Sequence, residues 1–289
     1  MNDRHHDDFG GLHRDLVATG AAIDRRGVLR LGAKFGAAFG ALQLVGCSNT
    51  PTAPTATTTA TTTTTTTAPT ATTTAPPSSA TCARVPEETA GPYPGDGSNG
   101  PTVLTSTGVV RRDIRDSFAG LSGTAGGVPL TIDLTIVSAS TCAPLVGRAI
   151  YIWHCDREGR YSLYTAGATN QNYLRGIQET DANGRVSFTS IYPACYAGRW
   201  PHIHFEEFPS LSSATNQNNK VATSQIALPK ATNDLVYAVA EYEQSIRNAA
   251  QVSLTSDMVF SDGASLELAT ITGSVAGGLA AALTVAVNA

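Results

Sequence analysis

The sequence is poor in charge, in aromatic side chains and in cysteine. Charged residues make up 15% of the 289 residues, aromatic residues 7%, and there are five cysteines. No CxxC pair occurs, which argues against a thiolate zinc site. From Cys82 to Ala289 there is no basic run, and 13 Lys and Arg stand against 18 Asp and Glu. Nucleic acid and anionic membrane surfaces are therefore poor partner candidates for this part of the chain.

Large side chains are absent from one long stretch of the N-terminal third. Every residue from Thr50 to Thr81 is Thr, Pro, Ala or Ser, and 18 of these 32 are Thr. Such a stretch cannot bury enough apolar surface to offset the entropy lost on folding. We therefore expect residues 48–81 to be a disordered linker, a stalk or a plain spacer. The remaining residues, 82–289, are long enough for one domain with a proper core.

Residues 1–47 have the pattern of an export signal. Arg25 and Arg26 precede an apolar, Gly/Ala-rich stretch from Phe35 to Gly46, which at about twelve residues is too short to cross a bilayer. Paired arginines indicate the twin-arginine route, and the ending Leu44-Val45-Gly46-Cys47 resembles a bacterial lipobox. We expect an exported protein that is either anchored at the cell surface through a lipid on Cys47 or, after ordinary cleavage, extracellular. The lipid would be its one contact with a membrane.

Four cysteines follow the linker. They are Cys82, Cys142, Cys155 and Cys195. An even number in an exported domain predicts two disulfides rather than a metal site. The three pairings cannot be distinguished by spacing alone.

The domain is predicted to be all-β, a β-sandwich of mostly antiparallel strands with one helix and long loops. Short segments rich in β-branched and aromatic residues alternate with turn signals, which is typical of such a fold. Leu130–Val137, with its period of two, is the clearest example. The other expected strands are Arg148–His154, Arg185–Thr189, Trp200–Glu206, Ala269–Ser274 and Leu283–Val287, and the expected helix is Asn233–Ala250.

His202 and His204 are the first candidates for chemistry. Residues i and i+2 of a strand point to the same face, so both imidazoles would meet at one spot and could bind a transition metal. A solvent-facing pair is the alternative. Tyrosines recur upstream of the histidines: Tyr192 and Tyr196 lie just before them, and Tyr161 ends the segment Asp156-Arg157-Glu158-Gly159-Arg160-Tyr161. Two tyrosinates with two neutral histidines would favour Fe(III), because a hard trivalent ion stabilises phenolate.

Several motifs together resemble the intradiol ring-cleavage dioxygenases, a family that includes protocatechuate 3,4-dioxygenases and catechol 1,2-dioxygenases. Residues 145–161, LVGRAIYIWHCDREGRY, are similar to its first signature, and residues 199–205, RWPHIHF, to its second. Residues 86–93, PEETAGPY, resemble its N-terminal segment, and residues 223–226, TSQI, the segment with its active-site glutamine. The resemblance extends in order from Cys82 to Asp262.

The resemblance implies a catalytic domain over residues 82–289 with a mononuclear Fe(III). Its ligands would be Tyr161, His202, His204 and a second tyrosinate, for which Tyr196 is preferred over Tyr192 because Tyr196-Ala197-Gly198-Arg199 matches the exported enzymes. Arg199 would stabilise developing negative charge, Tyr196 would leave the metal and take a substrate proton, and Gln225 would be the active-site glutamine. The implied reaction cleaves a catechol between its hydroxyls with O2 and gives a cis,cis-muconate.

Other interpretations stay open at this point. One alternative is a surface-anchored β-sandwich that acts as a binding or structural module and has lost enzymatic activity. Another is a zinc or copper hydrolase that uses His202 and His204. The oligomeric state is open between monomer and homodimer. Because Cys155 and Cys195 each lie close in sequence to an implied iron ligand, we prefer the pairs Cys155–Cys195 and Cys82–Cys142.

Overall fold

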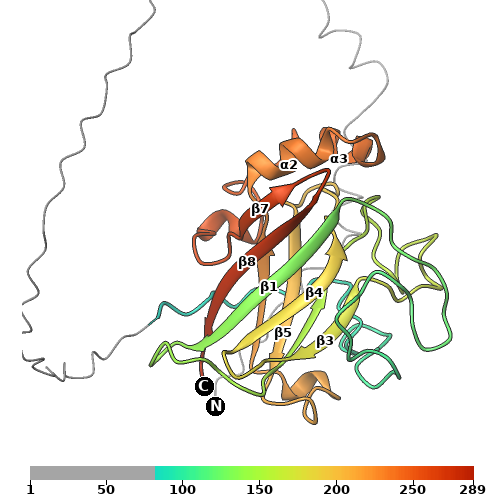
Figure 1. The fold of residues 1–289 in the computed structure, drawn as a ribbon. Coiled ribbons are helices and arrows are strands. Elements are labelled where there is room, and N and C mark those ends of the chain that lie inside the picture. The colour runs from blue at the N-terminus through green and yellow to red at the C-terminus, as the bar shows by residue number, and fades with distance from the viewer. Residues whose placement is uncertain (1–81) are drawn as a thin grey trace, which may run out of the picture. The chain divides into compact units, whose positions relative to one another are not determined.

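Two four-stranded β-sheets pack face to face in the computed structural model, which describes residues 82–289 (Figure 1). The predicted signal region 1–47 and the linker 48–81 lie outside the described residues. Within residues 82–289, none of the helices has the length and apolarity needed to span a membrane. The predicted all-β sandwich is confirmed.

The first sheet has the strand order β4-β1-β8-β7 and contains the two longest strands. Its members are β1 (Pro129–Ser138), β4 (Arg185–Ile191), β7 (Thr270–Ser274) and β8 (Gly278–Val287). β1 pairs antiparallel with β4 and parallel with β8, so the sheet is mixed. The period of two in β1 is realised, because Leu130, Ile132, Leu134 and Ile136 are all buried between the sheets.

The second sheet is antiparallel throughout and has the order β3-β2-β5-β6. Its members are β2 (Ala149–Trp153), β3 (Arg175–Glu179), β5 (His202–Phe208) and β6 (Ala222–Ala227). β3 and β6 are short and lack the apolar alternation that identified the other strands, and the sequence did not predict them as strands. All residues of β2, β5 and β6 are buried.

Both faces of this second sheet are covered. Ile203 and Phe205 of β5 belong to the core between the sheets. Tyr151 and Trp153 of β2 pack on the opposite face, in a second cluster with loop residues such as Val103. His202 and His204 alternate with Ile203 and Phe205, so they lie on this loop-covered face. The long loops therefore provide the cover over the histidines.

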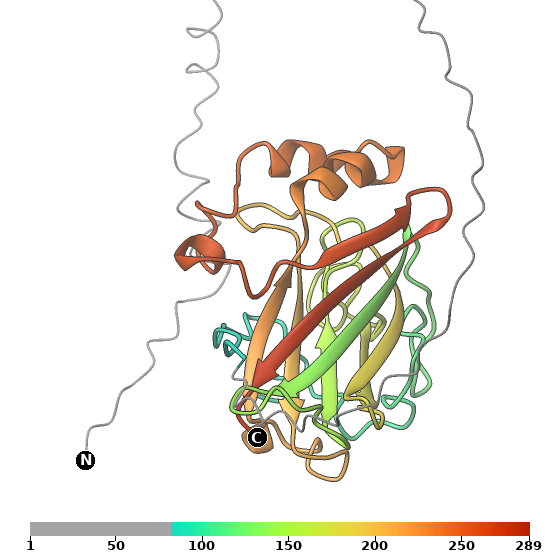
Figure 2. The same ribbon diagram turned by 60° about the vertical axis from the view of Figure 1, so that its left-hand side comes forward.

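Two short α-helices lie beyond one end of the sheets, as Figure 2 shows. They are α2 (Lys230–Tyr237) and α3 (Glu243–Ala249), with the 3-10 turn η3 (Ala240–Tyr242) between them. Two further 3-10 turns are η2 (Gln217–Asn219) and η4 (Phe260–Asp262).

The predicted single helix Asn233–Ala250 is wrong, because the chain is extended at Val239. In one continuous helix, Tyr237 and Tyr242 would lie about 140° apart around the axis. The break lets both rings reach the core between the sheets, where their centroids are 5.8 Å apart.

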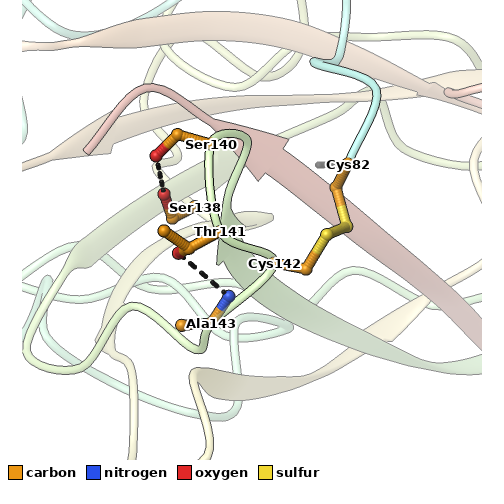
Figure 3. Close-up of a disulfide and its surroundings, with 6 residues drawn as sticks. All are labelled: Cys82, Ser138, Ser140, Thr141, Cys142 and Ala143. Carbon is orange, nitrogen blue, oxygen red and sulfur yellow. Dashed lines mark hydrogen bonds between the residues drawn. A yellow bond between two sulfur atoms is a disulfide. The ribbon is translucent and has the colours of Figure 1, made fainter. Parts of the chain in front are cut away.

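One disulfide joins Cys82 to Cys142 and ties the start of the domain to the loop after β1 (Figure 3). The backbone N–H of Cys82 also donates to the carbonyl of Ala139, at 2.9 Å. The predicted second disulfide, Cys155–Cys195, is wrong. Both cysteines are buried free thiols, and each interacts with a different carbonyl: Cys155 Sγ with Ala194 at 3.6 Å and Cys195 Sγ with Arg199 at 3.4 Å.

Candidate metal centre and active site

Two imidazoles and two phenols meet on the loop-covered face of the second sheet. Nε2 of His202 lies 3.1 Å from Nε2 of His204. The Oη atoms of Tyr161 and Tyr196 each lie 3.4 Å from the same His202 Nε2. Among the described residues, no group of three or more His, Cys, Asp or Glu could hold a metal ion. A metal at this point would therefore need the tyrosines.

The surroundings of the histidines keep both rings neutral. Burial lowers the pKa of His202 and His204 well below the ordinary value, and the charge of Arg199 adds to this for both. His202 Nδ1 makes a hydrogen bond with the carbonyl of Trp200. Because a carbonyl only accepts, Nδ1 carries the proton and Nε2 keeps a lone pair. His204 is held by stacking on Trp153, with ring centroids 4.8 Å apart.

The two phenols differ in burial and in pKa. Tyr161 is 2% exposed, and burial raises its pKa well above the ordinary value. Tyr196 is only partly buried. Burial raises the pKa of Tyr196 to about 12, against the influence of Arg199, which lowers it. Without a cation between them, both phenols stay protonated at neutral pH.

Tyr192 takes no part in this cluster. Its hydroxyl donates to Asn233 Oδ1 of α2, and its ring packs against Tyr237 in the core between the sheets. The structure therefore places Tyr196, and not Tyr192, beside the histidines.

Arg199 and Gln225 form a hydrogen-bonded chain beside the histidines. Gln225 of β6 is the register partner of His204 on β5. Arg199 Nη2 donates to Gln225 Oε1 at 2.7 Å, and Gln225 Nε2 donates to the carbonyl of Thr89 at 2.8 Å. The three predicted catalytic residues thus lie in one neighbourhood.

Asp257 completes the arrangement and was not singled out from the sequence. Its carboxylate accepts from Arg199 Nε at 2.9 Å and from the backbone N–H groups of Trp200, Val259 and Phe260. It is fully buried. Asp257 is 58 residues from Arg199 in a loop without regular pattern, so no local signal in the sequence identifies it.

The segment that follows Cys82 and contains Gly91 and Tyr93 forms a wall of the site. Gly91 has a φ of +67°, and a Cβ there would lie 3.4 Å from Cε1 of His204. The ring of Tyr93 packs on Tyr161, with centroids 5.0 Å apart, and on Tyr164, with centroids 5.2 Å apart. Glycine at position 91 allows the backbone to pass close to the histidine.

Arg175 of β3 fixes this wall, and the sequence alone did not indicate it. It is 1% exposed. Its five N–H groups have five neutral acceptors, which are the carbonyls of Tyr93, Pro94 and Ser162, the Ser162 hydroxyl and the Tyr151 hydroxyl. Arg175 therefore links the wall that carries Tyr93 to the residue after Tyr161.

The third histidine of the domain is separate from the site. His154 Nε2 bonds to Ser190 Oγ at 2.7 Å, and Nδ1 bonds to the carbonyl of Cys155 at 2.8 Å. Burial lowers its pKa to about 4. His154 is a neutral core residue with both nitrogens satisfied.

Comparisons with known proteins agree with the fold. A family model described as dioxygenase matches residues 100–212. The structure of an intradiol ring-cleavage dioxygenase from Tetranychus urticae is similar, with a TM-score of 0.58 and 25% identity over 72% of this chain and 95% of that one.

Two further solved structures are similar to the chain. The crystal structure of a second dioxygenase has a TM-score of 0.57 and 25% identity, over 72% of this chain and 95% of that one. The dioxygenase domain of a carbohydrate-binding fusion protein from Streptomyces sp. SirexAA-E has a TM-score of 0.47 and 21% identity, over 71% of this chain and 99% of that one. The search of curated proteins found no match.

The region that the dioxygenase model matches contains the motifs around Tyr161 and His202, and the Tetranychus urticae structure covers the same part of the chain. Over these residues the chain is similar to the intradiol ring-cleavage dioxygenases.

Proposed function

We propose that this domain is a non-haem Fe(III) dioxygenase that cleaves catechols between their two hydroxyls and gives cis,cis-muconate-type products. The observation that carries the proposal is the meeting of two phenol oxygens and two imidazole nitrogens at one point, with Nε2–Nε2 and Oη–Nε2 separations of 3.1 and 3.4 Å. Similarity to the intradiol ring-cleavage dioxygenases supports it.

The donor set suits a ferric ion. Burial makes both phenols hard to ionise on their own, so a strong positive charge among them would bind the phenolates tightly. His202 offers Nε2 because Nδ1 is held by the Trp200 carbonyl. Tyr161, Tyr196, His202 and His204 would hold the ion. When bound, Fe(III) would draw electron density from a coordinated catechol and so make its ring reactive toward O2.

The chain's own residues have separate tasks in this reaction. Tyr196 is more exposed than Tyr161, so it is the side chain that could turn away. As the phenolate that a ferric ion would hold, its Oη could then accept a proton from a catechol hydroxyl. Arg199 Nη1 has no hydrogen-bond partner among the described residues and can donate to negative charge that develops on the substrate. Gln225 orients Arg199 through the 2.7 Å hydrogen bond.

We also propose that the protein is exported, on the strength of Arg25, Arg26 and the segment that ends at Cys47. The Cys82–Cys142 disulfide supports this, since disulfides persist in oxidising compartments.

Metal content, visible spectrum and product identity test the function together. We expect stoichiometric iron, a red-brown tyrosinate-to-iron colour, and a muconate from catechol. Tyr161→Phe and His204→Ala should lose iron and colour, whereas Tyr196→Phe should keep iron more readily and bind catechol slowly. Tyr192→Phe, at a neighbouring buried tyrosine outside the site, is the control and should keep both. Stoichiometric zinc, or a semialdehyde product, would refute the proposal.

A further inference from the structure

Four buried residues form one row across the second sheet, with one residue on each strand. Trp153 of β2 is the register partner of Arg175 on β3 and of His204 on β5. The fourth is Gln225 of β6, which is the partner of His204 on its other side. All four are at most 2% exposed. Because cross-strand register fixes such a row, the backbone of Arg175 has a set place relative to the histidine, two strands away.

The side chain of Arg175 holds the residue that follows Tyr161. Its Nε donates to Oγ of Ser162 at 3.0 Å, and its Nη2 donates to the carbonyl of Ser162 at 2.9 Å. Ser162 Oγ donates in turn to the carbonyl of Tyr173 at 2.7 Å. Ser162 is 1% exposed, so the loss of either partner would leave a buried polar group unsatisfied. These bonds attach the loop of Tyr161 to the strand that stands in register with the histidine.

The backbone next to both partners is strained. Leu163 directly follows Ser162 and has a φ of +73°, and Leu174 directly precedes Arg175 and has a φ of +56°. A leucine at positive φ is unfavourable, because its Cβ comes too close to the following carbonyl oxygen. Such conformations persist only where the surrounding structure holds them, and they cluster at functional sites. The bonds between Ser162 and Arg175 lie where that hold is needed.

Hydrogen bonds within the loop give it shape but do not attach it to the sheet. The Tyr161 N–H donates to Oγ1 of Thr165 at 3.0 Å, and the Thr165 N–H donates to the carbonyl of Tyr161 at 2.9 Å. The Leu163 N–H donates to the carbonyl of Ala168 at 3.0 Å. All these partners move with the loop, so they leave its placement on the sheet to Ser162 and its bonds.

We propose that Arg175 and Ser162 are positioning residues for Tyr161, which hold its phenol beside the imidazoles of the sheet against the strain of the neighbouring backbone. The inference rests on the proposed function, because that function makes Tyr161 a metal ligand. Neither residue has to touch the metal or the substrate in this role. Groups that orient a metal ligand from outside typically contribute a factor of about 10–100 to metal affinity.

Hydrogen exchange on the metal-free full chain tests this hold without iron. In Ser162→Ala, the hydrogen-bonded amides of residues 161–165 should exchange about tenfold faster, since one buried hydrogen bond contributes about that factor to local stability. Ser190→Ala is the matched control. Ser190 is an equally buried serine whose Oγ bonds to His154, away from the site, and its loss should leave these amides unchanged.

Iron affinity and visible colour test the effect on the ligand. Tyr196→Phe leaves Tyr161 as the one phenolate of the proposed ligand set, so the visible band of this variant reports on Tyr161. Adding Ser162→Ala should weaken iron binding about tenfold and shift the band. Arg175→Met should do both more strongly, and Arg175→Lys, which keeps a charged donor, should recover part of the loss. Ser190→Ala should change neither affinity nor band.

Unchanged exchange or an unchanged band in Ser162→Ala would overturn the proposal, as would the same changes in Ser190→Ala. If Arg175→Met does not fold, Ser162→Ala decides alone. If the wild type takes up no ferric ion, the proposed function fails, and the exchange measurement decides the positioning role by itself.

Discussion

Replacing Asp257 by Asn should separate the role of its charge from that of its shape. The carboxylate accepts from Arg199 Nε and the Trp200 N–H on one oxygen, and from the Val259 and Phe260 N–H groups on the other. Whichever way the substituted amide is turned, its NH2 faces at least two N–H donors. The change also leaves the buried guanidinium of Arg199 without a counter-charge.

The expected loss of stability follows from burial. Removing one partner of a buried ion pair costs about 3–5 kcal/mol, because the remaining charge is left uncompensated. For a domain of this length, 1 kcal/mol shifts Tm by about 2–4 °C, so Asp257→Asn should lower Tm by roughly 10 °C. Asp234→Asn is the control. Its pair with Lys230 is exposed on α2, with side-chain exposures of 58% and 74%, and should contribute less than about 1 kcal/mol.

A double-mutant cycle tests the reasoning by urea unfolding of Asp257→Asn, Arg199→Gln and the double variant. Since the double variant has no unpaired buried charge, it should recover part of the loss, with a coupling energy of about 1–3 kcal/mol. Additive effects, with coupling under about 0.5 kcal/mol, would show that Asp257 does not act through Arg199.

Three further predictions concern stability and location. Burial raises the pKa of Glu206 from 4.5 to about 8, that of Glu207 to about 7 and that of Glu267 to about 8. A carboxyl whose pKa is raised in the folded state stabilises that state fully below pH 4.5, and this stabilisation is lost as the pH rises through 7–8. The Tm should thus fall between pH 7 and pH 9, above the range in which the three buried histidines oppose this effect. Glu267→Gln should flatten the fall in a series of melting curves, and an unchanged slope would contradict this. Cys142→Ser should lower the free energy of unfolding by up to about 4 kcal/mol, since the disulfide closes a loop with a sequence separation of 60, and a variant as stable as the wild type in non-reducing denaturant would refute it. Cys47→Ser should move the protein from the membrane fraction to the medium, and a wild type already found in the medium would refute the lipid anchor.

Local patterns predicted much of the fold. The alternation in β1 is visible in the sequence because one face of that strand is buried and the other is partly exposed. β6 is buried on both faces, so its sequence carries no alternation and did not identify a strand. The helix 233–250 failed for a similar reason: Tyr237 and Tyr242 both pack into the core, which a regular helix would not allow.

The residues of the candidate site also fall into those that a local pattern predicts and those that it does not. His202 and His204 are two residues apart on one strand, so strand geometry alone predicts that they meet, and a family resemblance adds Tyr161, Tyr196, Arg199 and Gln225. Asp257 and Arg175 interact through contacts that span 58 and 81–82 residues. Such contacts depend on how loops fold over the second sheet, and no spacing in a single sequence encodes that.

Two buried arginines with different partners lie at this site. Arg199 is paired with Asp257, yet its charge still helps to lower the pKa of both His202 and His204. Arg175 has only neutral acceptors, so its charge persists in the interior. There it adds to burial, His202 and Arg199 in lowering the pKa of His204. A carboxylate beside Arg175 would cancel this influence, and one placed there by Ser162→Asp should make His204 easier to protonate and the site less able to keep a metal at mildly acid pH. Both buried arginines therefore favour a neutral imidazole at His204, Arg199 from within an ion pair and Arg175 from among neutral acceptors.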